Sequence, residues 1–332
     1  MTARPRSAPG ILFIGSGYAT RLHSKVLARR FPAVRLGYFS RSAGEAAELA
    51  RTFGGRAFAG SWDEALRDDE FDTAFVTTPP DTHCHLALQA LAFGKHVIVE
   101  KPAFLTGGEF DEVERAASEA SRMVLVAENY FYKPLRRRLR DVIESGVLGQ
   151  VRIIEINAVK RQPVEGWRAD PARAGGGALF EGGIHWVSLM ANLGLEIRDV
   201  RCYLPDAPAE HERSVVLVAE YRQGAVGVLT YSWEIPSTLR GLRLSRIWGT
   251  RGSILFESNG LFMLRSGPRP GLWAPGLTDI AGYRAMLGDF IRALTTNTPP
   301  EFTLADARRD VELVRSAYAG STTETVSHGR ST

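Results

Sequence analysis

The sequence has few of the features that mark secreted or membrane-spanning proteins. It contains only two cysteines, Cys84 and Cys202, which lie far apart and outside any CxxC spacing; free thiols in a reducing compartment are therefore expected. It has no uninterrupted apolar run of about 18 residues, the length that a membrane-spanning helix needs. Residues 1–9 carry no apolar segment of the kind that precedes a signal cleavage site. These absences predict a cytoplasmic protein without a membrane partner.

Charge of one sign is not concentrated anywhere in the chain. Lys and Arg total 41 against 37 Asp and Glu, so the formal net charge is only +4. The densest basic segment, residues 136–140, is interleaved with Leu135, Leu139 and Val142 in a pattern typical of the solvated face of an amphipathic helix. We therefore expect no nucleic-acid partner.

The length of the chain and the order of its apolar segments predict two domains. A chain of 332 residues exceeds the size at which one core usually stops growing. Over residues 1–127, short apolar runs alternate with helical patterns, which is typical of an α/β fold with a doubly wound parallel sheet. The expected strands are 10–14, 34–39, 72–77, 96–99 and 124–127, and the expected helices are 21–31, 43–53, 62–66, 82–93 and 108–121.

The pattern changes in residues 128–332, where strands dominate after a predicted helix at 134–145. The connections at 223–224, 239–241 and 251–252 are short turns that contain glycine, so the strands that they join should be antiparallel neighbours. We expect an α+β domain with an open, mainly antiparallel sheet. Its open face needs a cover, which predicts a homodimer or homotetramer. The expected strands are 151–159, 200–204, 214–222, 225–233, 242–249 and 253–256, and the further helices are 177–193, 283–294 and 304–319.

A glycine turn follows the first predicted strand and precedes the first predicted helix. Glycine at positions 15 and 17 lets the backbone turn sharply and approach a pyrophosphate, whose charge then lies at a helix N-terminus. Thr20 stands where such turns usually have a third Gly or Ala, and a turn without a ligand is the alternative interpretation. The residues expected to bind a dinucleotide here are Gly15, Ser16, Gly17, Tyr18 and Ala19.

The end of the second strand predicts which dinucleotide is bound. An acidic residue at this point usually accepts hydrogen bonds from the ribose 2′-hydroxyl. The chain has Ser40, Arg41 and Ser42 instead. Without a carboxylate a 2′-phosphate is not repelled, and Arg41 can pair with it. This favours NADP over NAD, although an exposed Arg after a strand is also commonplace.

Two further strands end in distinctive motifs at the same edge of the predicted sheet. Thr78-Pro79 follows one strand, and Glu100-Lys101-Pro102 ends another. A lysine ammonium at this edge can hydrogen-bond a substrate hydroxyl, and its pKa shifts when it is desolvated. Ligands bind at the carboxyl edge of such sheets. We expect cofactor contacts from Thr78, Pro79, His83, Glu100 and Lys101.

These motifs together resemble the glucose–fructose oxidoreductase/inositol dehydrogenase/MocA family. The resemblance implies a dinucleotide-binding Rossmann domain, a sheet-based substrate domain, and NAD(P)-dependent oxidation or reduction of sugars, cyclitols and related polyols. It also implies that Lys101 contacts the reacting centre, often with a cis peptide before Pro102. The matching features are Gly15-x-Gly17 with His23, Thr78-Pro79 with His83, Gly94-Lys95-His96-Val97-x-x-Glu100-Lys101-Pro102, Gly175-Gly176-Gly177-Ala178, Gly183-Ile184-His185, and Asp289-Phe290 ahead of Leu304.

One motif departs from the family pattern of Asp-x-Gly-x-His in the substrate domain. The chain has Glu181 in place of the Asp, followed by Gly183 and His185. A spacing of four on a helix puts Glu181 and His185 on one face, so a carboxylate tuning the imidazole is expected to persist. The longer Glu changes the reach toward the substrate. The expected catalytic residues are Lys101, His185 and Glu181.

No metal site is expected. His83, Cys84 and His85 are consecutive on a predicted helix and therefore point in different directions. Glu181 and His185 alone fall short of the usual number of zinc ligands.

Aromatic and polar residues near the same cleft suit a sugar. Trp and Tyr faces stack on sugar rings, whereas Arg and Asn bind hydroxyls or a carboxylate. Each of these residues has ordinary packing or surface exposure as its alternative. The expected substrate-binding residues are Asn129, Tyr130, Arg161, Trp167, Arg168, Glu181 and His185.

The expected function is hydride transfer between a nicotinamide and a hydroxyl- or ketone-bearing carbon of a polyol or keto-sugar. His185 would move the proton, and Lys101 would polarise the oxygen. Two alternatives stay open. The first is a glycosidase that retains NAD and oxidises its substrate transiently. The second is a nucleotide-sensing regulator with the same fold and no catalysis.

Overall fold

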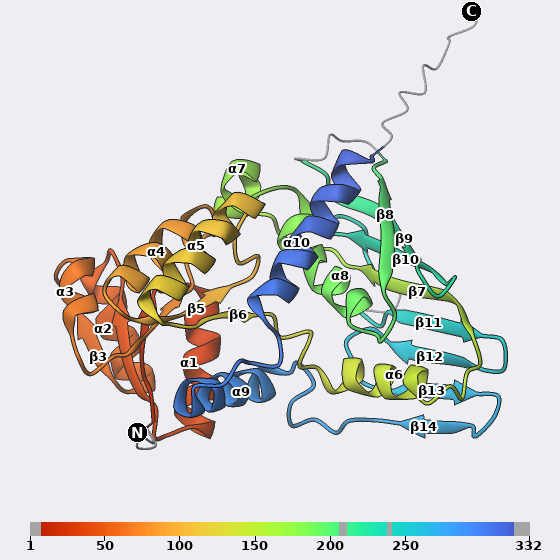
Figure 1. The fold of residues 1–332 in the computed structure, drawn as a ribbon, viewed down its shortest axis with the longest axis horizontal. Helices are drawn as coiled ribbons and strands as arrows, with labels where there is room; N and C mark the ends of the chain where they lie inside the picture. The colour runs from red at the N-terminus through yellow and green to blue at the C-terminus, as the bar shows by residue number, and fades with distance from the viewer. Residues whose placement is uncertain (1–7, 206–210, 238–240, 322–332) are drawn as a thin grey trace, which may run out of the picture.

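The structure, a computed structural model, describes residues 8–205, 211–237 and 241–321. Figure 1 shows two lobes, each built on one sheet, with the first coloured red to yellow-orange and the sheet of the second yellow-green to blue. The predicted α/β fold, a parallel sheet followed by a mainly antiparallel one, is confirmed.

The first lobe contains a six-stranded parallel sheet with the order β3-β2-β1-β4-β5-β6. β1 (Gly10–Ile14) is buried along its whole length, as its continuous apolar run predicts. β3 (Arg56–Phe58) lies outside the predicted strands, because three residues at a sheet edge are too short to show a clear pattern. The other strands are β2 (Arg35–Phe39), β4 (Thr73–Val76), β5 (His96–Glu100) and β6 (Val124–Ala127).

Helices cover both faces of this sheet. α4 (His83–Ala92) and α5 (Gly107–Ala120) contact each other on one face, and α1 (Tyr18–Arg30) lies on the other (Figure 1). The strand order reverses between β1 and β4, and ligands of such sheets bind at the carboxyl ends of the strands beside this switch point. The remaining helices of the lobe are α2 (Ala43–Phe53), α3 (Trp62–Arg67) and the short η1 (Pro80–Thr82).

The second lobe contains an eight-stranded sheet with the order β14-β13-β12-β11-β7-β10-β9-β8. All neighbouring strands are antiparallel except β7 and β10, which run parallel. The strands are β7 (Val151–Val159), β8 (Ile197–Tyr203), β9 (Ser214–Tyr221), β10 (Val226–Ser232), β11 (Leu244–Gly249), β12 (Ser253–Glu257), β13 (Met263–Ser266) and β14 (Gly271–Trp273).

The prediction of an antiparallel turn at 239–241 is wrong. β10 and β11 are not neighbours, because β7 lies between them and pairs with both. No local signal announces this arrangement, since β7 comes much earlier in the chain and its pairing is set by long-range packing. Residues 239 and 240 of that connection lie outside the described residues.

Helices cover one face of the second sheet, and no described helix covers the other. α6 (Pro134–Glu144), α8 (Ile184–Ala191) and α10 (Leu304–Ala319) lie on the covered face (Figure 1). Met190 of α8, for example, accepts a hydrogen bond from the Tyr221 hydroxyl of β9. Side chains of β9 accordingly alternate between buried and half-buried.

The helix predicted at 177–193 is divided in two. Its first part, η3 (Leu179–Gly183), is a π-helix, and α8 follows directly. The buried carboxyl group of Glu212 accepts a hydrogen bond from the Leu179 N–H at 2.6 Å. A Cβ at Gly177 would lie 1.5 Å from Glu212 Oε2, so only glycine allows this close approach. The glycine run therefore lets a buried acid hold the segment that carries Glu181.

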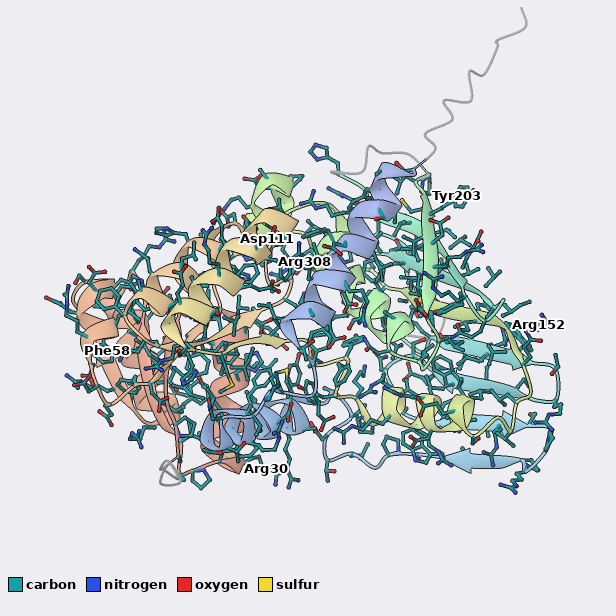
Figure 2. The ribbon with its side chains drawn as sticks, in the orientation of Figure 1. Arg30, Phe58, Asp111, Arg152, Tyr203 and Arg308 are labelled. Atoms are coloured by element: carbon teal, nitrogen blue, oxygen red, sulfur yellow. The ribbon has the colours of Figure 1, made fainter. Side chains whose placement is uncertain are left out.

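The last two helices return to the first lobe. α9 (Tyr283–Thr296) packs against α1, and α10 contacts α5, β6 and α8. Figure 2 shows Asp111 of α5 and Arg308 of α10 next to each other, and their side chains form an ion pair at 2.7 Å. The domain boundary between residues 127 and 128 stays a prediction. α9 and α10 follow it in sequence but contact elements that precede it.

The raised pKa of Glu212 predicts how the stability of the fold depends on pH. Burial raises the pKa of its carboxyl to about 8, although the Leu179 N–H and Tyr318 hydroxyl oppose this. The folded state then holds a proton that the unfolded chain releases near pH 4, so stability falls as pH rises between these values. Glu212→Gln mimics the protonated form. We expect the variant to exceed the wild type in unfolding free energy by about 1–3 kcal/mol above pH 8.

Urea unfolding at about pH 5, 7 and 9 measures this difference. The gap should close toward pH 5, where the wild-type carboxyl is protonated. Glu119→Gln, an exposed position on α5, is the matched control and should show no such gap. A Glu212→Gln variant that is destabilised equally at every pH would contradict the prediction.

Candidate active site

The turn between β1 and α1 fits a pyrophosphate. Gly15 has a φ of 111°, a left-handed conformation that favours glycine. At Gly17, the N-cap of α1, a Cβ would meet nothing within 4 Å, so open space lies before the helix N-terminus. The first turn of α1 contains no acidic residue. Backbone N–H groups and the helix dipole there favour an anion.

Thr20 fits in place of the usual small residue. Its side chain is fully buried, and its hydroxyl donates to the Gly15 carbonyl at 2.8 Å. The same oxygen lies 2.7 Å from the Thr77 hydroxyl at the end of β4. The threonine therefore ties the glycine turn to the neighbouring strand across the switch point. Tyr18 is exposed, and Ala19 is half-buried.

A carboxylate that the sequence prediction missed lies beside the end of β2. Glu45, on the first turn of α2, accepts hydrogen bonds from Ser16 at 2.5 Å and Ser40 at 3.0 Å. The two serine hydroxyls hold the pKa of Glu45 below its usual range. Arg41 is exposed beside them, and Ser42 caps α2 by accepting from the Glu45 N–H. The missing acid of the strand end is thus supplied five residues later, from the helix.

His83 joins two loops at the carboxyl edge of the sheet. It is buried, and its ring nitrogens lie 2.8 Å from the Thr78 carbonyl and 3.0 Å from the Pro102 carbonyl. The Lys101–Pro102 peptide is cis, in agreement with the family resemblance. His83 therefore positions the Thr78-Pro79 loop and the Lys101-Pro102 loop together.

The buried His23 and the half-buried Glu100 form a pair behind Lys101. His23 Nε2 lies 2.6 Å from Glu100 Oε1, and Glu100 also accepts from the Lys101 N–H. Burial raises the pKa of the Glu100 carboxyl, but the hydrogen bond and charge of His23, together with Lys101, outweigh it and leave the pKa below its ordinary value. A negative charge therefore lies beside the Lys101 backbone at the sheet edge.

Lys101 reaches across to the second lobe. Its ammonium donates to the Glu181 backbone carbonyl at 2.7 Å and lies 3.7 Å from the Glu181 carboxylate. Arg168 donates to the same carboxylate at 3.1 Å. Burial raises the pKa of Glu181, but the two cations outweigh it and hold the pKa below its usual range. Glu181 is thus an ionised carboxylate shared by two cations.

His185 has a different carboxylate partner from the predicted one. Its Nδ1 lies 2.7 and 2.9 Å from the two oxygens of Glu128, which follows β6. Glu181 makes no hydrogen bond with it, because Glu181 belongs to η3 and faces Lys101. A carboxylate only accepts, so Nδ1 carries the proton and Nε2 keeps a lone pair.

The surroundings of His185 favour its neutral form. Burial lowers the pKa of the imidazole, and the nearby Lys101 lowers it further, while Glu128 raises it without cancelling the shift. The Tyr130 ring stacks on the imidazole with ring centroids 4.4 Å apart. His185 is therefore held in one orientation as a neutral base.

The other predicted substrate residues differ in their placement. Asn129 is buried and donates to the Ala281 carbonyl, so its amide supports the fold. Trp167 is half-buried, with the Arg168 guanidinium 4.4 Å from its ring centroid. Arg161 is exposed beside a hollow of about 530 Å³, which is lined by Arg161, Gln162, Pro163, Val164, Arg213, Trp233 and Glu234.

Three charged side chains around the site escaped the sequence prediction. Glu45 accepts a hydrogen bond from Ser16, 29 residues away, and Glu128 contacts His185, 57 residues away. Lys160 lies within the charges of Arg243, Glu181, Lys101 and Arg168. An acid in the first turn of the helix after β2 is a usable signal for Glu45. No local pattern marks Glu128 or Lys160.

The described part of the chain contains neither a metal-binding cluster nor a membrane-spanning helix. Within residues 8–205, 211–237 and 241–321, no group of three or more His, Cys, Asp or Glu is arranged to hold a metal ion. In the same part of the chain, none of the helices has both the length and the apolar character that crossing a bilayer requires.

Two family models match the chain. Residues 10–128 match the model of an oxidoreductase family with an NAD-binding Rossmann fold. Residues 136–255 match a model for the GFO/IDH/MocA C-terminal domain. Both models belong to the family that the motifs resemble.

Known proteins agree with these matches. The chain is 28% identical to YfiI, an uncharacterized oxidoreductase of Bacillus subtilis (strain 168), over 58% of the chain and 53% of that protein. It is 26% identical to a levoglucosan dehydrogenase of Pseudarthrobacter phenanthrenivorans, over 64% of the chain and 62% of that protein. The matched segments thus span less than two thirds of these two relatives.

A solved structure extends the likeness over nearly the whole chain. The crystal structure of GenD2 from gentamicin A biosynthesis, in complex with NAD, superposes with a TM-score of 0.82 at 27% identity. The match covers 96% of this chain and 95% of GenD2. Because the two family models together match more than two thirds of the sequence, the protein belongs to the GFO/IDH/MocA family of oxidoreductases.

Proposed function

We propose that the protein transfers a hydride between a nicotinamide dinucleotide and a hydroxyl- or ketone-bearing carbon of a sugar, sugar derivative or cyclitol. The observation that carries this proposal is the cluster of Lys101, Glu181 and His185 at the carboxyl edge of the nucleotide-binding sheet. The levoglucosan dehydrogenase relative supports a carbohydrate substrate. When bound, the nicotinamide would supply or accept the hydride.

His185 is the general base in the oxidation direction. Its neutral Nε2 accepts the proton of the substrate hydroxyl, and Glu128 stabilises the imidazolium that forms. In the reduction direction the same nitrogen returns the proton. The stacked Tyr130 ring keeps the imidazole plane in place while its charge changes.

Lys101 stabilises the reacting oxygen. Its ammonium carries a positive charge at the sheet edge and keeps donor capacity beyond its bond to the Glu181 carbonyl. Negative charge on the substrate oxygen during hydride transfer is favoured by such a donor. Glu181 holds the ammonium in place, and Arg168 holds Glu181.

The arrangement favours catalysis over nucleotide sensing. A regulator does not need a histidine whose Nδ1 is fixed by a buried carboxylate so that Nε2 stays free. No specific contact favours the NAD-retaining glycosidase over simple hydride transfer.

Cofactor choice depends on two opposing charges at the end of β2. Arg41 attracts a 2′-phosphate, which supports the prediction of NADP, whereas the Glu45 carboxylate repels it and suits the 2′-hydroxyl of NAD. We therefore propose that the protein accepts both cofactors, with Glu45 reducing the preference for NADP that Arg41 creates.

The open face of the second sheet supports a homodimer or homotetramer. Ile153, Val226 and Trp248 lie opposite one another on three adjacent strands, with exposed fractions of 48%, 41% and 36%. A second copy of the same face would bury this apolar row. A cytoplasmic location is also proposed, on the basis of Cys84 and Cys202, which are both free thiols.

Lys101→Met should abolish turnover without loss of the cofactor. The thioether keeps the length of the side chain but removes the charge and donor at the reacting oxygen, so kcat should fall at least ~100-fold. A fluorescence titration with NADPH and NADH, followed by a screen of polyols and keto-sugars, measures both properties. Lys25→Met, on the exposed face of α1, serves as the control. Unchanged turnover would exclude Lys101 from the chemistry.

Glu128→Gln should shift the pH profile of oxidation. Glu128 raises the pKa of His185, so a neutral Gln that keeps the hydrogen bond should lower that pKa further below its ordinary value. The acid limb of kcat/KM moves to lower pH, because His185 must be neutral to accept a proton. A full pH profile of wild type, Glu128→Gln and the Glu119→Gln control tests this. An unmoved acid limb would rule out the pairing as functional.

Glu45→Gln should strengthen NADPH binding. Removing the carboxylate removes its repulsion of the 2′-phosphate, and we expect the dissociation constant of NADPH to fall about tenfold while that of NADH changes less than about threefold. Arg41→Ala should weaken NADPH selectively. Fluorescence titrations of both variants measure these constants, and an equal effect on the two cofactors would refute the assignment.

A further inference from the structure

Positive side chains outnumber negative ones where the second sheet meets η3 and α8. Lys160 follows β7, and the charges that act on it come from Arg243, Lys101 and Arg168, which are positive, and from Glu181, which is negative. Three cations and one carboxylate therefore surround a fourth cation.

Lys160 itself has no partner within the described residues. It is half-buried, and only its backbone is engaged, through the N–H that donates to the Ser232 carbonyl. Its ammonium forms no hydrogen bond or ion pair with any residue that the structure describes. Burial and the neighbouring Arg243 lower its pKa. The Lys160 ammonium is thus partly desolvated, and an anion that binds there would supply the negative charge that it lacks.

Arg243 is a second cation whose hydrogen-bonding capacity is not fully satisfied. It is only 8% exposed, and its Nε is buried without a hydrogen-bond partner. Its Nη2 donates to the neutral Asn259 side chain, and its guanidinium lies 5.6 Å from the Trp186 ring centroid. Arg243 therefore forms no ion pair with a carboxylate among the described residues, and its charge acts on Lys160.

The two nearby carboxylates, Glu181 and Glu257, already have other partners. Glu181 is shared by Lys101 and Arg168. Glu257 is fully buried and accepts hydrogen bonds from Asn259 and from the Leu261 N–H. Neither forms an ion pair with Lys160 or Arg243 in the described part of the chain. The missing negative charge is thus not supplied by these residues.

We propose that the substrate carries an anionic substituent, a carboxylate or a phosphate ester, and that Lys160 binds it within the positive field of Arg243 and Arg168. This inference rests on the proposed oxidoreductase function, because it places the substituent beside Lys101 and His185. A sugar acid or a sugar phosphate meets this requirement, whereas a neutral polyol leaves the Lys160 charge without a counter-ion.

Neutral hydroxyls are weaker candidates for this position. A hydroxyl accepts a hydrogen bond from an ammonium but does not neutralise it. A charge-assisted bond to a carboxylate or phosphate oxygen is about twice as strong as a neutral one. The surplus of positive charge thus discriminates between sugars that have the same ring and differ only in one acidic group.

Calorimetric binding to the protein saturated with NADH tests the inference with three probes that share one ring: glucose, glucuronate and glucose 6-phosphate. Wild type should bind at least one acidic probe about tenfold or more tightly than glucose. The two acidic probes distinguish a carboxylate from a phosphate site. Lys160→Met should remove this preference and leave glucose binding within about twofold, whereas Lys160→Arg should keep the preference.

Lys160→Met is expected to fold normally, because the side chain has no described partner to lose, and thermal unfolding checks this. Lys25→Met again serves as the control. Equal binding of glucose and both acids by wild type overturns the inference, as does absence of binding by both acids.

Hydride transfer by the same proteins separates this inference from the proposed function. If acidic probes bind through Lys160 but no probe or screened sugar is oxidised or reduced, the proposed function fails and the anion site stands. If a neutral sugar is turned over as efficiently as its acid, the function stands and the anion site fails.

Discussion

The site depends on the pairing of the ionised Glu181 carboxylate with two cations, Lys101 and Arg168. This carboxylate comes from the second lobe and is buried, which is unfavourable for a charge unless cations compensate it. Lys101, from the edge of the first sheet, and Arg168, from the short 3-10 helix Gly166–Ala169, do so together. Removing either cation leaves a buried charge partly unpaired, so the contact that joins the lobes is also the contact that orients Lys101.

Much of the fold was predictable, because its signals are local. Continuous apolar runs such as Gly10–Ile14 mark buried parallel strands, and the glycine turn after that run marks the nucleotide position. The central place of β7 was not predictable, since it arises from pairing with β10 and β11 much later in the chain. The π-helix at Leu179–Gly183 also escaped, because a distant acid, Glu212, holds it.

The same division applies to the site. Lys101 and His185 stand in motifs that can be read along the chain, and the structure brings both near Glu181. Glu128 lies 57 residues from His185 in sequence, so nothing local predicts that it, rather than Glu181, holds the imidazole. Glu45 shows the limit of a positional rule: the expected acid was absent from the strand end, yet a carboxylate reaches the same place from the next helix.

The docking of α9 against α1 also has a consequence for synthesis. Chains fold as they emerge from the ribosome, with N-terminal parts first. The outer face of α1 meets its cover only when residues 283–296 arrive, and Met286, Leu287 and Phe290 of that helix are among the buried residues. Nearly the whole chain must therefore be translated before the nucleotide-binding lobe is sealed. Until then this face of α1 stays without its cover, and a ribosome that stalls early releases a fragment in which it is exposed.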